Sequence, residues 1–334
     1  TLFGLAASLG LGATQVGEGL ERLVGIENTV TNQLLLIATI TGAATISLLT
    51  GVKKGIRRLS EMNLGFAALL LVFVLFTAST WQLLQAFFAD LLGYGSVVAE
   101  RSFLIAGRTE QESQWMADWT IPYYGWWIAW APFVGMFIAR ISKGRTIREF
   151  VLGVLLVPSL VTFFWFSVFG HTAIDLELQG ANIAASVNED ISTAIYVTLE
   201  ELPFAAVSSA LAGIVVTIFF VTSSDSASFV VDMLTSGGHP NPPKWQRVFW
   251  ATTEGIVAAV LLYTGGTSAL RAFQAAVVSI GLPFAVLMLL MVVSLVVALY
   301  GETKGDTELD LTAEAESGKN LEKAKQLEKA KSSV

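Results

Sequence analysis

Long apolar segments separated by short polar ones run through almost the whole chain. Eight of them have a length near the roughly 20 residues that a membrane-crossing helix requires. We expect these helices at residues 1–20, 33–50, 63–88, 116–139, 147–169, 202–221, 248–264 and 273–300. The pattern predicts an all-α polytopic membrane protein whose first helix starts at or before the first residue.

The composition supports this interpretation and excludes several kinds of chemistry. Hydrophobic residues make up 54% of the 334 residues, whereas charged residues make up only 14%. Such a chain belongs in a lipid bilayer. The absence of cysteine excludes disulfides, thiol catalysis and cysteine zinc sites. With only His171 and His239 to supply imidazole, a membrane enzyme would have few catalytic groups. The net charge of -7 gives no reason to expect a nucleic-acid partner.

The basic residues lie on alternate loops of the predicted membrane topology. If the loops at residues 53–58, 140–148 and 244–247 and the C-terminal tail face the cytoplasm, all but four of the 20 Lys and Arg are inside. The exceptions are Arg22, Arg101, Arg108 and Arg271. The positive-inside rule therefore predicts a multi-pass protein of the inner (plasma) membrane with a cytoplasmic C-terminus.

One segment, residues 118–139, is unusually rich in aromatic residues. Its Trp and Tyr residues are Trp119, Tyr123, Tyr124, Trp126, Trp127 and Trp130. In a helix, Trp126 and Trp130 share a face and Trp127 lies about 100° away, so the three indoles would border one wedge. Such rings suit a cation that cannot donate hydrogen bonds, such as a quaternary ammonium. The alternative is an aromatic belt at the membrane surface. Because Gly125, Pro132 and Gly135 predict an interrupted helix, the binding site is the sharper hypothesis.

Several long motifs resemble the betaine/carnitine/choline transporter family. The aromatic segment continues as GWWIAWAPFVGMFIARISKGRTIREF, and the chain also contains FFVTSSDSASFVV and SLGLGATQVGEGL. The resemblance implies import of a quaternary ammonium solute such as glycine betaine or choline, by Na+ symport with alternating access. The alternatives are Na+-independent or proton-coupled exchange of carnitine- or choline-like substrates, or a truncated chain that does not transport.

The resemblance also implies a fold of the leucine-transporter type, with two inverted five-helix repeats. Residues 1–115 would hold the last three helices of the first repeat and an outer interfacial helix, which in the family helps to form a homotrimer. Residues 116–300 would form the complete second repeat, and residues 301–334 a cytoplasmic tail. The other helices of the family would precede this chain. The tail ends in a basic near-repeat, which suggests osmotic regulation through anionic lipid as a weaker hypothesis.

The family's substrate contacts correspond to Trp126, Trp127 and Trp130, with Tyr124 beside them. Tyr124 stands where relatives often have Trp, so the outer shape of the site and the choice of amine stay open. No cofactor is expected, and Na+ is the implied coupling ion. Exchangers of the family have a methionine where this chain has Val134, which favours ion-coupled symport.

The Na+ ligands implied by the resemblance are the Phe219 carbonyl and the Thr222 and Ser223 hydroxyls. Hard oxygen ligands suit an alkali cation, and we expect this segment near the cytoplasmic end of its helix. The alternative is that the hydroxyls bond to carbonyls one turn earlier. A second Na+ site would use Thr1 and Phe133, although Leu5 replaces one of its threonines.

Three charged residues are candidates for a cytoplasmic gate, namely Arg140, Arg148 and Asp225. The two arginines follow the aromatic helix, and Asp225 lies just past the expected Na+ ligands. The alternative is that the arginines only set the orientation of the chain in the membrane.

Overall fold

Helices make up nearly all of the part of the chain that the structure describes, and that part contains no strand. The computed structural model describes residues 1–50, 53–102, 109–238 and 242–303. Its contacts divide the chain into two units, Thr1–Gly281 and Leu282–Val334. All but the first three residues of the expected cytoplasmic tail lie outside the described residues.

Six of the described helices are long and apolar enough to cross a membrane. They contain the segments Val30–Ser47, Arg57–Thr77, Ile147–Leu178, Ala205–Thr235, Lys244–Gly265 and Ala269–Gly301. The first and fourth expected segments form α1 (Leu2–Val24) and α6 (Ile121–Ile141), which are not among the six. The reason is compositional, because the Gly and polar residues of α1 and the Trp and Tyr residues of α6 lower the mean hydropathy. The chain is an all-α, multi-pass membrane protein.

The third expected segment, residues 63–88, is not one helix. Helix α3 (Lys53–Thr77) ends before Ala78, and α4 (Thr80–Ser102) starts two residues later. The hydroxyl of Thr77 donates to the carbonyl oxygen of Phe73 at 2.8 Å, and that of Thr80 donates to the carbonyl of Leu75 at 2.7 Å. The bond from Thr80 satisfies a carbonyl in the last turn of α3, where carbonyl groups lack partners within the helix. The outer segment expected at residues 89–117 consists of the end of α4, α5 (Glu110–Trp115) and the first residues of the next element.

Two helix starts follow directly from the sequence. Thr109 precedes α5 and Thr146 precedes α7 (Ile147–Val151), each with a Glu three residues later. In both cases the Thr hydroxyl accepts from the Glu backbone N–H and the Glu side chain accepts from the Thr backbone N–H. This capping box satisfies N–H groups that a helix start otherwise leaves without partners.

The remaining elements are the long helix α8 and several short ones. They are η1 (Met116–Thr120) and η2 (Leu152–Leu156), which are π-helical, the 3₁₀ turns η3 (Ile191–Thr193) and η4 (Gly266–Ser268), α8 (Val157–Leu178), α9 (Ile183–Glu189) and α10 (Ala194–Glu200). The polar segment expected as a loop at residues 171–201 is therefore mostly helical, since α8 continues to Leu178 and α9 and α10 follow.

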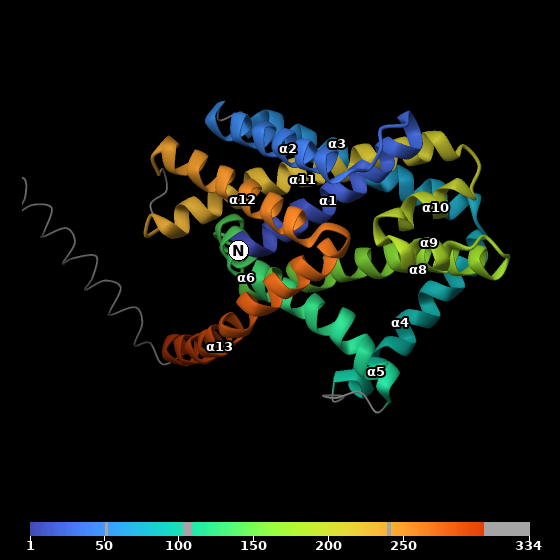
Figure 1. Ribbon diagram of the computed structural model, residues 1–334. Coiled ribbons are helices and arrows are strands. Elements are labelled where there is room, and N and C mark those ends of the chain that lie inside the picture. The colour runs from blue at the N-terminus through green and yellow to red at the C-terminus, as the bar shows by residue number, and fades with distance from the viewer. Residues whose placement is uncertain (51–52, 103–108, 239–241, 304–334) are drawn as a thin grey trace, which may run out of the picture. The chain divides into compact units, whose positions relative to one another are not determined.

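Helix α1 is the centre of the first unit, packed against α2 (Val30–Thr50), α11 (Ala205–Thr235) and α12 (Lys244–Gly265) (Figure 1). Its glycines permit this contact. A methyl group added at Gly10 would lie 2.0 Å from Phe273 Cζ, and one added at Gly12 would lie 2.0 Å from Phe220 Cε2. Small residues let membrane helices approach closely, which is how α1 joins α2, α6, α12 and the start of α13 (Ala269–Thr303) in one apolar cluster.

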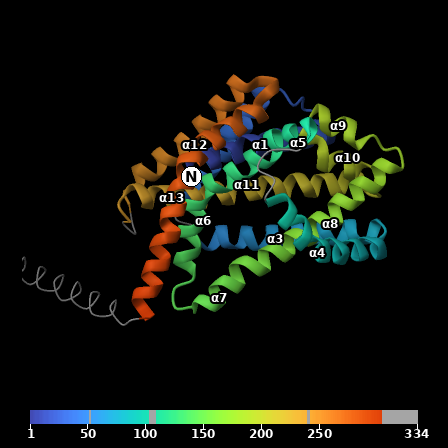
Figure 2. The same ribbon diagram turned by 90° about the horizontal axis from the view of Figure 1, so that it is seen from below.

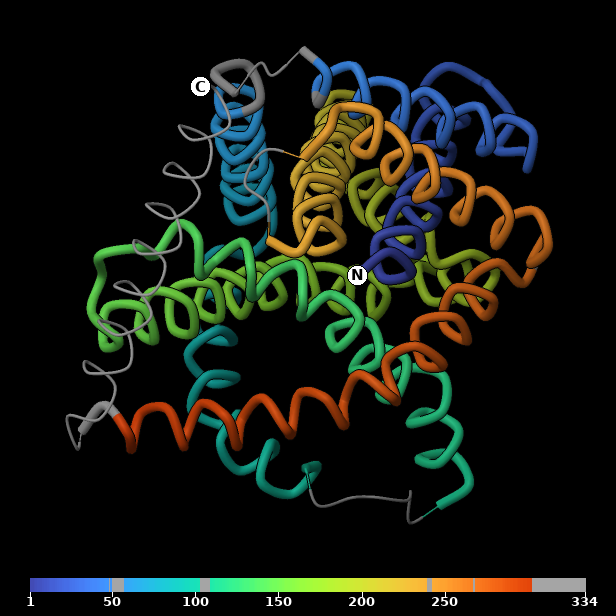
Figure 3. The backbone as a smooth tube through the Cα atoms, turned by 90° about the vertical axis from the view of Figure 1, so that its left-hand side faces the viewer, coloured from blue at the N-terminus to red at the C-terminus, as the bar shows by residue number. Residues whose placement is uncertain are grey.

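A second apolar cluster joins α3, α4, α8, α10 and α11. Helix α8 packs along α4, and α3 packs along α11, as the views in Figures 2 and 3 show. Leu70, Val74 and Leu83 are each at most 1% exposed within this cluster. It fixes one side of α11, and the cluster around α1 fixes another.

The second unit begins inside α13 (Ala269–Thr303), after Gly281. Its described residues are helical and almost entirely apolar from Leu282 to Tyr300. None of the residues in the apolar window of this helix is buried. The segment has the composition of a helix surrounded by lipid.

Candidate functional site

The aromatic segment forms one uninterrupted helix rather than the broken helix expected from Gly125, Pro132 and Gly135. Helix α6 runs through all three positions, and the irregular turn precedes it as the π-helix η1. Gly125 serves packing instead, because a methyl group there would lie 3.2 Å from the Cα atom of Val278. The glycine allows the start of α13 to approach α6 closely.

The three expected indoles point in different directions. Trp126 Nε1–H lies 3.1 Å from the carbonyl oxygen of Gly4 and 3.1 Å from the hydroxyl of Ser8, both on α1. Trp127 is 56% exposed and packs edge-on against Tyr123, with ring centroids 6.2 Å apart.

Trp130 is turned into a third apolar cluster, together with Leu5 and Phe133, and its Nε1–H has no hydrogen-bond partner within the described residues. Helix α1 occupies the space beside Trp126 and Trp130, so the structure does not bring the three indoles around one cavity. Their contact with a substrate stays a prediction.

Tyr124, the fourth expected substrate residue, lies elsewhere again. It is 63% exposed and lines a groove of about 790 Å³ with Tyr94 of α4 and Trp115 of α5. The structure therefore separates Tyr124 from Trp126, although they are only two positions apart in the sequence.

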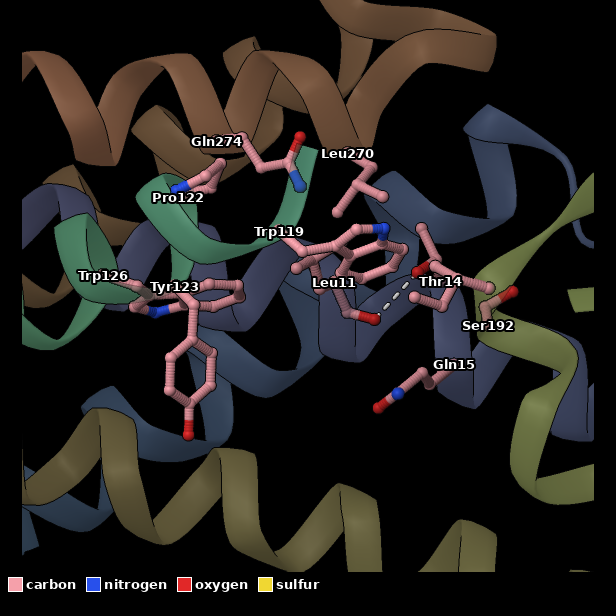
Figure 4. Close-up of a pocket in the computed structure, with 11 residues that line it drawn as sticks. Leu11, Thr14, Gln15, Trp119, Pro122, Tyr123, Trp126, Ser192, Leu270 and Gln274 are labelled. Atoms are coloured by element: carbon pink, nitrogen blue, oxygen red, sulfur yellow. Dashed lines mark hydrogen bonds between the residues drawn. The ribbon is translucent and has the colours of Figure 1, made fainter. Parts of the chain in front are cut away.

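A pocket of about 160 Å³ lies between α1, α6 and the elements η1, η3 and α13. Since a water molecule takes about 30 Å³ in the liquid, the volume corresponds to roughly five waters, or one small solute. Figure 4 shows its lining. The lining residues are Leu11, Thr14, Gln15, Trp119, Pro122, Tyr123, Trp126, Ile191, Ser192, Leu270 and Gln274.

The aromatic rings of this pocket come from Trp119, Tyr123 and Trp126. Among the described residues that line it, none is Asp, Glu, Lys, Arg or His. Its polar groups are hydroxyls and side-chain amides, such as those of Thr14 and Gln15 (Figure 4). Aromatic faces without a fixed charge suit a small cation that donates no hydrogen bonds.

One hydrogen bond fixes the irregular turn at the pocket. The amide Nε2 of Gln274 donates to the carbonyl oxygen of Asp118 at 2.7 Å. Asp118 belongs to η1, and π-helical turns leave carbonyls poorly satisfied and are frequent at functional sites. Gln274 therefore holds the turn that presents Trp119 to the pocket.

The expected Na+ ligands lie in the middle of a continuous helix. Helix α11 continues to Thr235, so Thr222 and Ser223 do not lie at its C-terminal end as the sequence suggested. The Thr222 hydroxyl bonds back to the carbonyl oxygens of Ile218 at 2.9 Å and Phe219 at 3.2 Å. A back-bonded hydroxyl is compatible with an intact helix. The Phe219 carbonyl and the Thr222 hydroxyl thus lie close together but are hydrogen-bonded to each other, and their binding of Na+ stays a prediction.

The residues expected at the second Na+ site supply few oxygen ligands. Phe133 is 7% exposed and packs with Leu5 in the same apolar cluster. The hydroxyl of Thr1 is buried and has no hydrogen-bond partner among the described residues. Because Leu5 supplies no oxygen, its contact with Phe133 makes this part of the site apolar.

The three gate candidates are not brought together. The Arg140 guanidinium lies 5.0 Å from the ring centroid of Phe229, and its Nη1 lies 3.4 Å from Met233 Sδ. Asp225 is buried and faces Ser47 of α2. Arg148 is exposed on α7. A role for these residues in gating stays a prediction.

Arg140 shares the Phe229 ring with Arg247, which was not among the candidates expected from the sequence. The Arg247 guanidinium lies 5.3 Å from the centroid of this ring, and its Nε donates to Asp232 Oδ2 at 3.1 Å. Asp232 is fully buried. The sequence signal that could have found the Arg247–Asp232 pair is Asp232 itself, because an acidic residue within an apolar span needs a partner.

The C-terminal end of α1 is held by ion pairs. Arg22 Nε lies 2.5 Å from Glu18 Oε1, and its Nη1 lies 2.6 Å from Glu200 Oε2 at the end of α10. Burial acts to lower the pKa of Arg22, but the bonds and charges of Glu200 and Glu18 outweigh it and raise that pKa. Nearby, burial is the main cause that raises the pKa of Tyr196 to about 12, and the charge of Glu18 adds to it.

Comparison with known proteins identifies the family of this chain. The model of the betaine/carnitine/choline family transporters matches residues 1–304. The chain belongs to the betaine/carnitine/choline transporter family. This is a transporter family rather than an enzyme family.

Several curated members of the betaine/carnitine/choline transporter family are similar to this chain. The glycine betaine transporter OpuD of Bacillus subtilis is 42% identical over 91% of this chain and 58% of its own length. A glycine betaine/proline/choline transporter of Vibrio parahaemolyticus is 42% identical over 92% of this chain and 54% of its own length. An uncharacterized transporter of Mycobacterium tuberculosis is 45% identical over 91% of this chain and 50% of its own length. The chain thus spans about half the length of the curated relatives it matches.

Two aromatic residues of the pocket, Trp119 and Tyr123, were not among the substrate residues expected from the sequence. Both belong to the aromatic segment, but no site was assigned to them. The signal that could have found them is their spacing, since Trp119, Tyr123 and Trp126 follow one another at helical intervals of four and three residues.

Proposed function

We propose that this chain contains substrate and ion sites of a secondary transporter that imports a quaternary ammonium compatible solute by Na+ symport. Glycine betaine and choline are the leading substrates, and alternating access is the expected mechanism. The observation that carries the proposal is the uncharged pocket lined by Trp119, Tyr123 and Trp126. A quaternary ammonium has no N–H to donate, so aromatic faces at roughly 0.5 to 2 kcal/mol per contact are suitable partners.

The polar groups of the pocket would contact the other end of the solute. Glycine betaine carries a carboxylate, and choline a hydroxyl, at a short distance from the ammonium. The hydroxyl of Thr14 and the amides of Gln15 and Gln274 lie on the pocket wall. Because side-chain amides can donate to either group, they support a zwitterion or an alcohol, whereas the Thr14 hydroxyl already donates to the Leu11 carbonyl at 2.8 Å. Preference between the two substrates would follow from which donors are used.

Coupling to Na+ is supported by the oxygen atoms around Thr222. Its hydroxyl touches the Phe219 carbonyl, and Ser223 adds another hydroxyl on the next residue. To bind Na+, the Thr222 hydroxyl would turn its lone pairs toward the ion and give up its bonds to the backbone. The binding free energies of ion and solute would then be linked through the arrangement of α1, α6 and α11.

The experiment is uptake of radiolabelled glycine betaine and choline, with and without Na+, in cells that lack such carriers. The protein should be expressed from the complete open reading frame that encodes this chain. We expect Na+-dependent uptake that is strongly reduced in Trp126→Ala and Thr222→Ala. Uptake that ignores Na+ would contradict the coupling and favour exchange. Absence of uptake from protein shown to reach the membrane would contradict the proposed substrate class.

A homotrimer is the proposed assembly. Helix α4 exposes large apolar side chains, including Trp81 at 70%, Phe88 at 59% and Leu92 at 85%. Such a surface is covered by lipid or by another copy of the chain. Cross-linking in the membrane, followed by size analysis, tests the proposal: a species three times the size of the monomer is expected, and a monomer alone would contradict it.

A further inference from the structure

We propose that Glu254 is a proton-binding site within the membrane-spanning part of this protein. Glu254 lies near the middle of the 22-residue helix α12 and is 2% exposed. Helix α12 is one of the six helices apolar and long enough to cross a bilayer. An ionisable side chain at that depth is costly and needs a partner or a neutralising proton.

The immediate partners of Glu254 are serine hydroxyls from α11. Ser228 Oγ donates to Glu254 Oε2 at 3.1 Å. Ser224 lies one turn earlier on the same face of α11 and beside the same carboxyl group. Ser224 is 3% exposed, and its Oγ has no hydrogen bond of good geometry with any described residue. The Glu254 carboxyl group is thus the polar group that lies beside this buried hydroxyl.

A proton on Glu254 would neutralise the buried carboxyl group itself. One carboxyl oxygen already accepts from Ser228. A proton on the other oxygen would remove the negative charge and make that oxygen a donor toward the Ser224 hydroxyl oxygen, which lies beside the same carboxyl group.

No cation among the surrounding helices is available to neutralise Glu254 instead. Within the described residues, α2 contains no ionisable side chain, and those of α1 are confined to its last turns, where Glu18 and Arg22 pair with each other. On α12 itself, the Arg247 guanidinium is bonded to Asp232 of α11.

The other acidic group on the facing helix points elsewhere. Asp225 of α11 is turned toward Ser47 of α2. Lys244 starts α12, about 15 Å along the helix axis from Glu254 at 1.5 Å per residue. The environment of Glu254 thus provides hydroxyl groups but no positive charge, which is the setting of a carboxyl group that holds its own proton.

Proton exchange at this site would require movement of α12. The residue after Glu254, Gly255, packs so closely on α2 that a methyl group there would lie 2.5 Å from Thr41 Oγ1. Water can therefore reach Glu254 only when α12 separates from α11 or α2. Occupancy by the proton is then linked to the conformation of the helix pair. The consequence for transport rests on the proposed function, whereas the proton site itself does not.

Infrared difference spectra of the purified chain in lipid, recorded between acidic and alkaline pH, test the site directly. They report the C=O stretch of protonated carboxyl groups. We expect a band that is lost in Glu254→Gln, retained in Asp225→Asn and shifted in Ser224→Ala and Ser228→Ala. The serine variants keep the test decisive if Glu254→Gln does not fold.

Three results would overturn the proposal. One is a difference spectrum that is the same in the wild type, in Glu254→Gln and in both serine variants. Another is a Glu254 band that does not change with pH, which would indicate a purely structural carboxylic acid. The third is removal of the band by Na+ at constant pH, which would indicate a cation site.

Uptake measurements then test the link to transport. In protein from the complete reading frame, the pH dependence of uptake should be lost in Glu254→Gln and retained in Asp90→Asn, whose carboxylate is exposed beside His171. If Glu254→Gln keeps the wild-type pH dependence, the link to transport is wrong. If the wild type takes up no quaternary amine, the proposed function fails, while the infrared result still decides the proton site.

Discussion

The indole Nε1–H of Trp126 donates to the hydroxyl oxygen of Ser8 at 3.1 Å, and so joins α6 to α1 beside the aromatic pocket. The same N–H also lies 3.1 Å from the Gly4 carbonyl. The N–H edge of the Trp126 ring is thereby held in place by polar contacts while the residue lines the pocket. Fixing a ring before a ligand arrives reduces the entropy lost on binding.

Trp126→Phe should retain an aromatic ring but lose this anchor. A net hydrogen bond contributes about 1 kcal/mol to stability, so a modest decrease in melting temperature is expected. Substrate KM should rise because the ring is no longer fixed. Thermal unfolding in detergent and uptake kinetics are the measurements.

The matched control for Trp126→Phe is Ser8→Ala. It removes one acceptor and leaves the Gly4 carbonyl, so its effect should be smaller. A larger effect of Ser8→Ala than of Trp126→Phe would contradict the role assigned to the indole.

Thr222→Ala should weaken Na+ activation of uptake by roughly ten-fold or more, which corresponds to about 1.4 kcal/mol. The change removes one proposed oxygen ligand and leaves the helix intact. Thr217→Ala is the control, because Thr217 lies on the same helix and its hydroxyl likewise bonds back, to the Gly213 carbonyl at 2.8 Å. Equal Na+ dependence in the two variants would mean that Thr222 is only a back-bonded residue.

Arg22→Ala should destabilise the first unit by roughly 1–3 kcal/mol. The substitution leaves Glu18, which is 8% exposed, without its charged partner, and unpaired buried polar groups carry costs of this size. Arg57→Ala is the comparison, because Arg57 and Glu61 form a pair of the same spacing with side chains 81% and 59% exposed. Such exposed pairs contribute little, so stability should be almost unchanged. Chemical unfolding measures the stability of both variants. Similar losses of stability in Arg22→Ala and Arg57→Ala would contradict the larger contribution expected of the buried pair.

Gly10→Ala should destabilise the helix contact between α1 and α13. The new methyl group would meet the ring of Phe273, which is fully buried and has little room to move. Overpacking of this kind costs about 1–3 kcal/mol. Gly42→Ala adds the same methyl group to α2, where nothing lies within 4 Å. There we expect no loss, since alanine favours helix. The melting temperatures of the two variants test this prediction. A Gly10→Ala protein as stable as the wild type would contradict the close packing of Gly10 against Phe273.

The membrane orientation can be tested with single cysteines, because the chain has none of its own. Lys143→Cys lies in the turn between α6 and α7, and Gln179→Cys lies just after α8. The positive-inside rule places the first in the cytoplasm and the second outside. A maleimide that cannot cross the membrane should therefore label Gln179→Cys in intact cells and Lys143→Cys only after lysis. The reverse result would invert the proposed topology.

The sequence by itself determined the class of this protein. Its apolar segments, its aromatic stretch and its motifs predicted an all-α membrane protein of the betaine/carnitine/choline transporter family, and the family match over residues 1–304 confirms this. The capping boxes at Thr109 and Thr146 are also local, because each depends on residues three apart in the chain, although the expected segments did not make use of them.

Only the tertiary structure decided which side chains meet. Trp126, Trp127 and Trp130 share a short stretch of sequence, yet α1 engages the first and third and leaves the second exposed. Thr222 could have ended a helix, but the buried residues that follow it carry α11 on to Thr235. Glu254 and Ser228, 26 residues apart, meet because α11 and α12 pack together. The reason is physical: periodicity fixes the face on which a residue lies, whereas the neighbour of that face depends on distant parts of the chain.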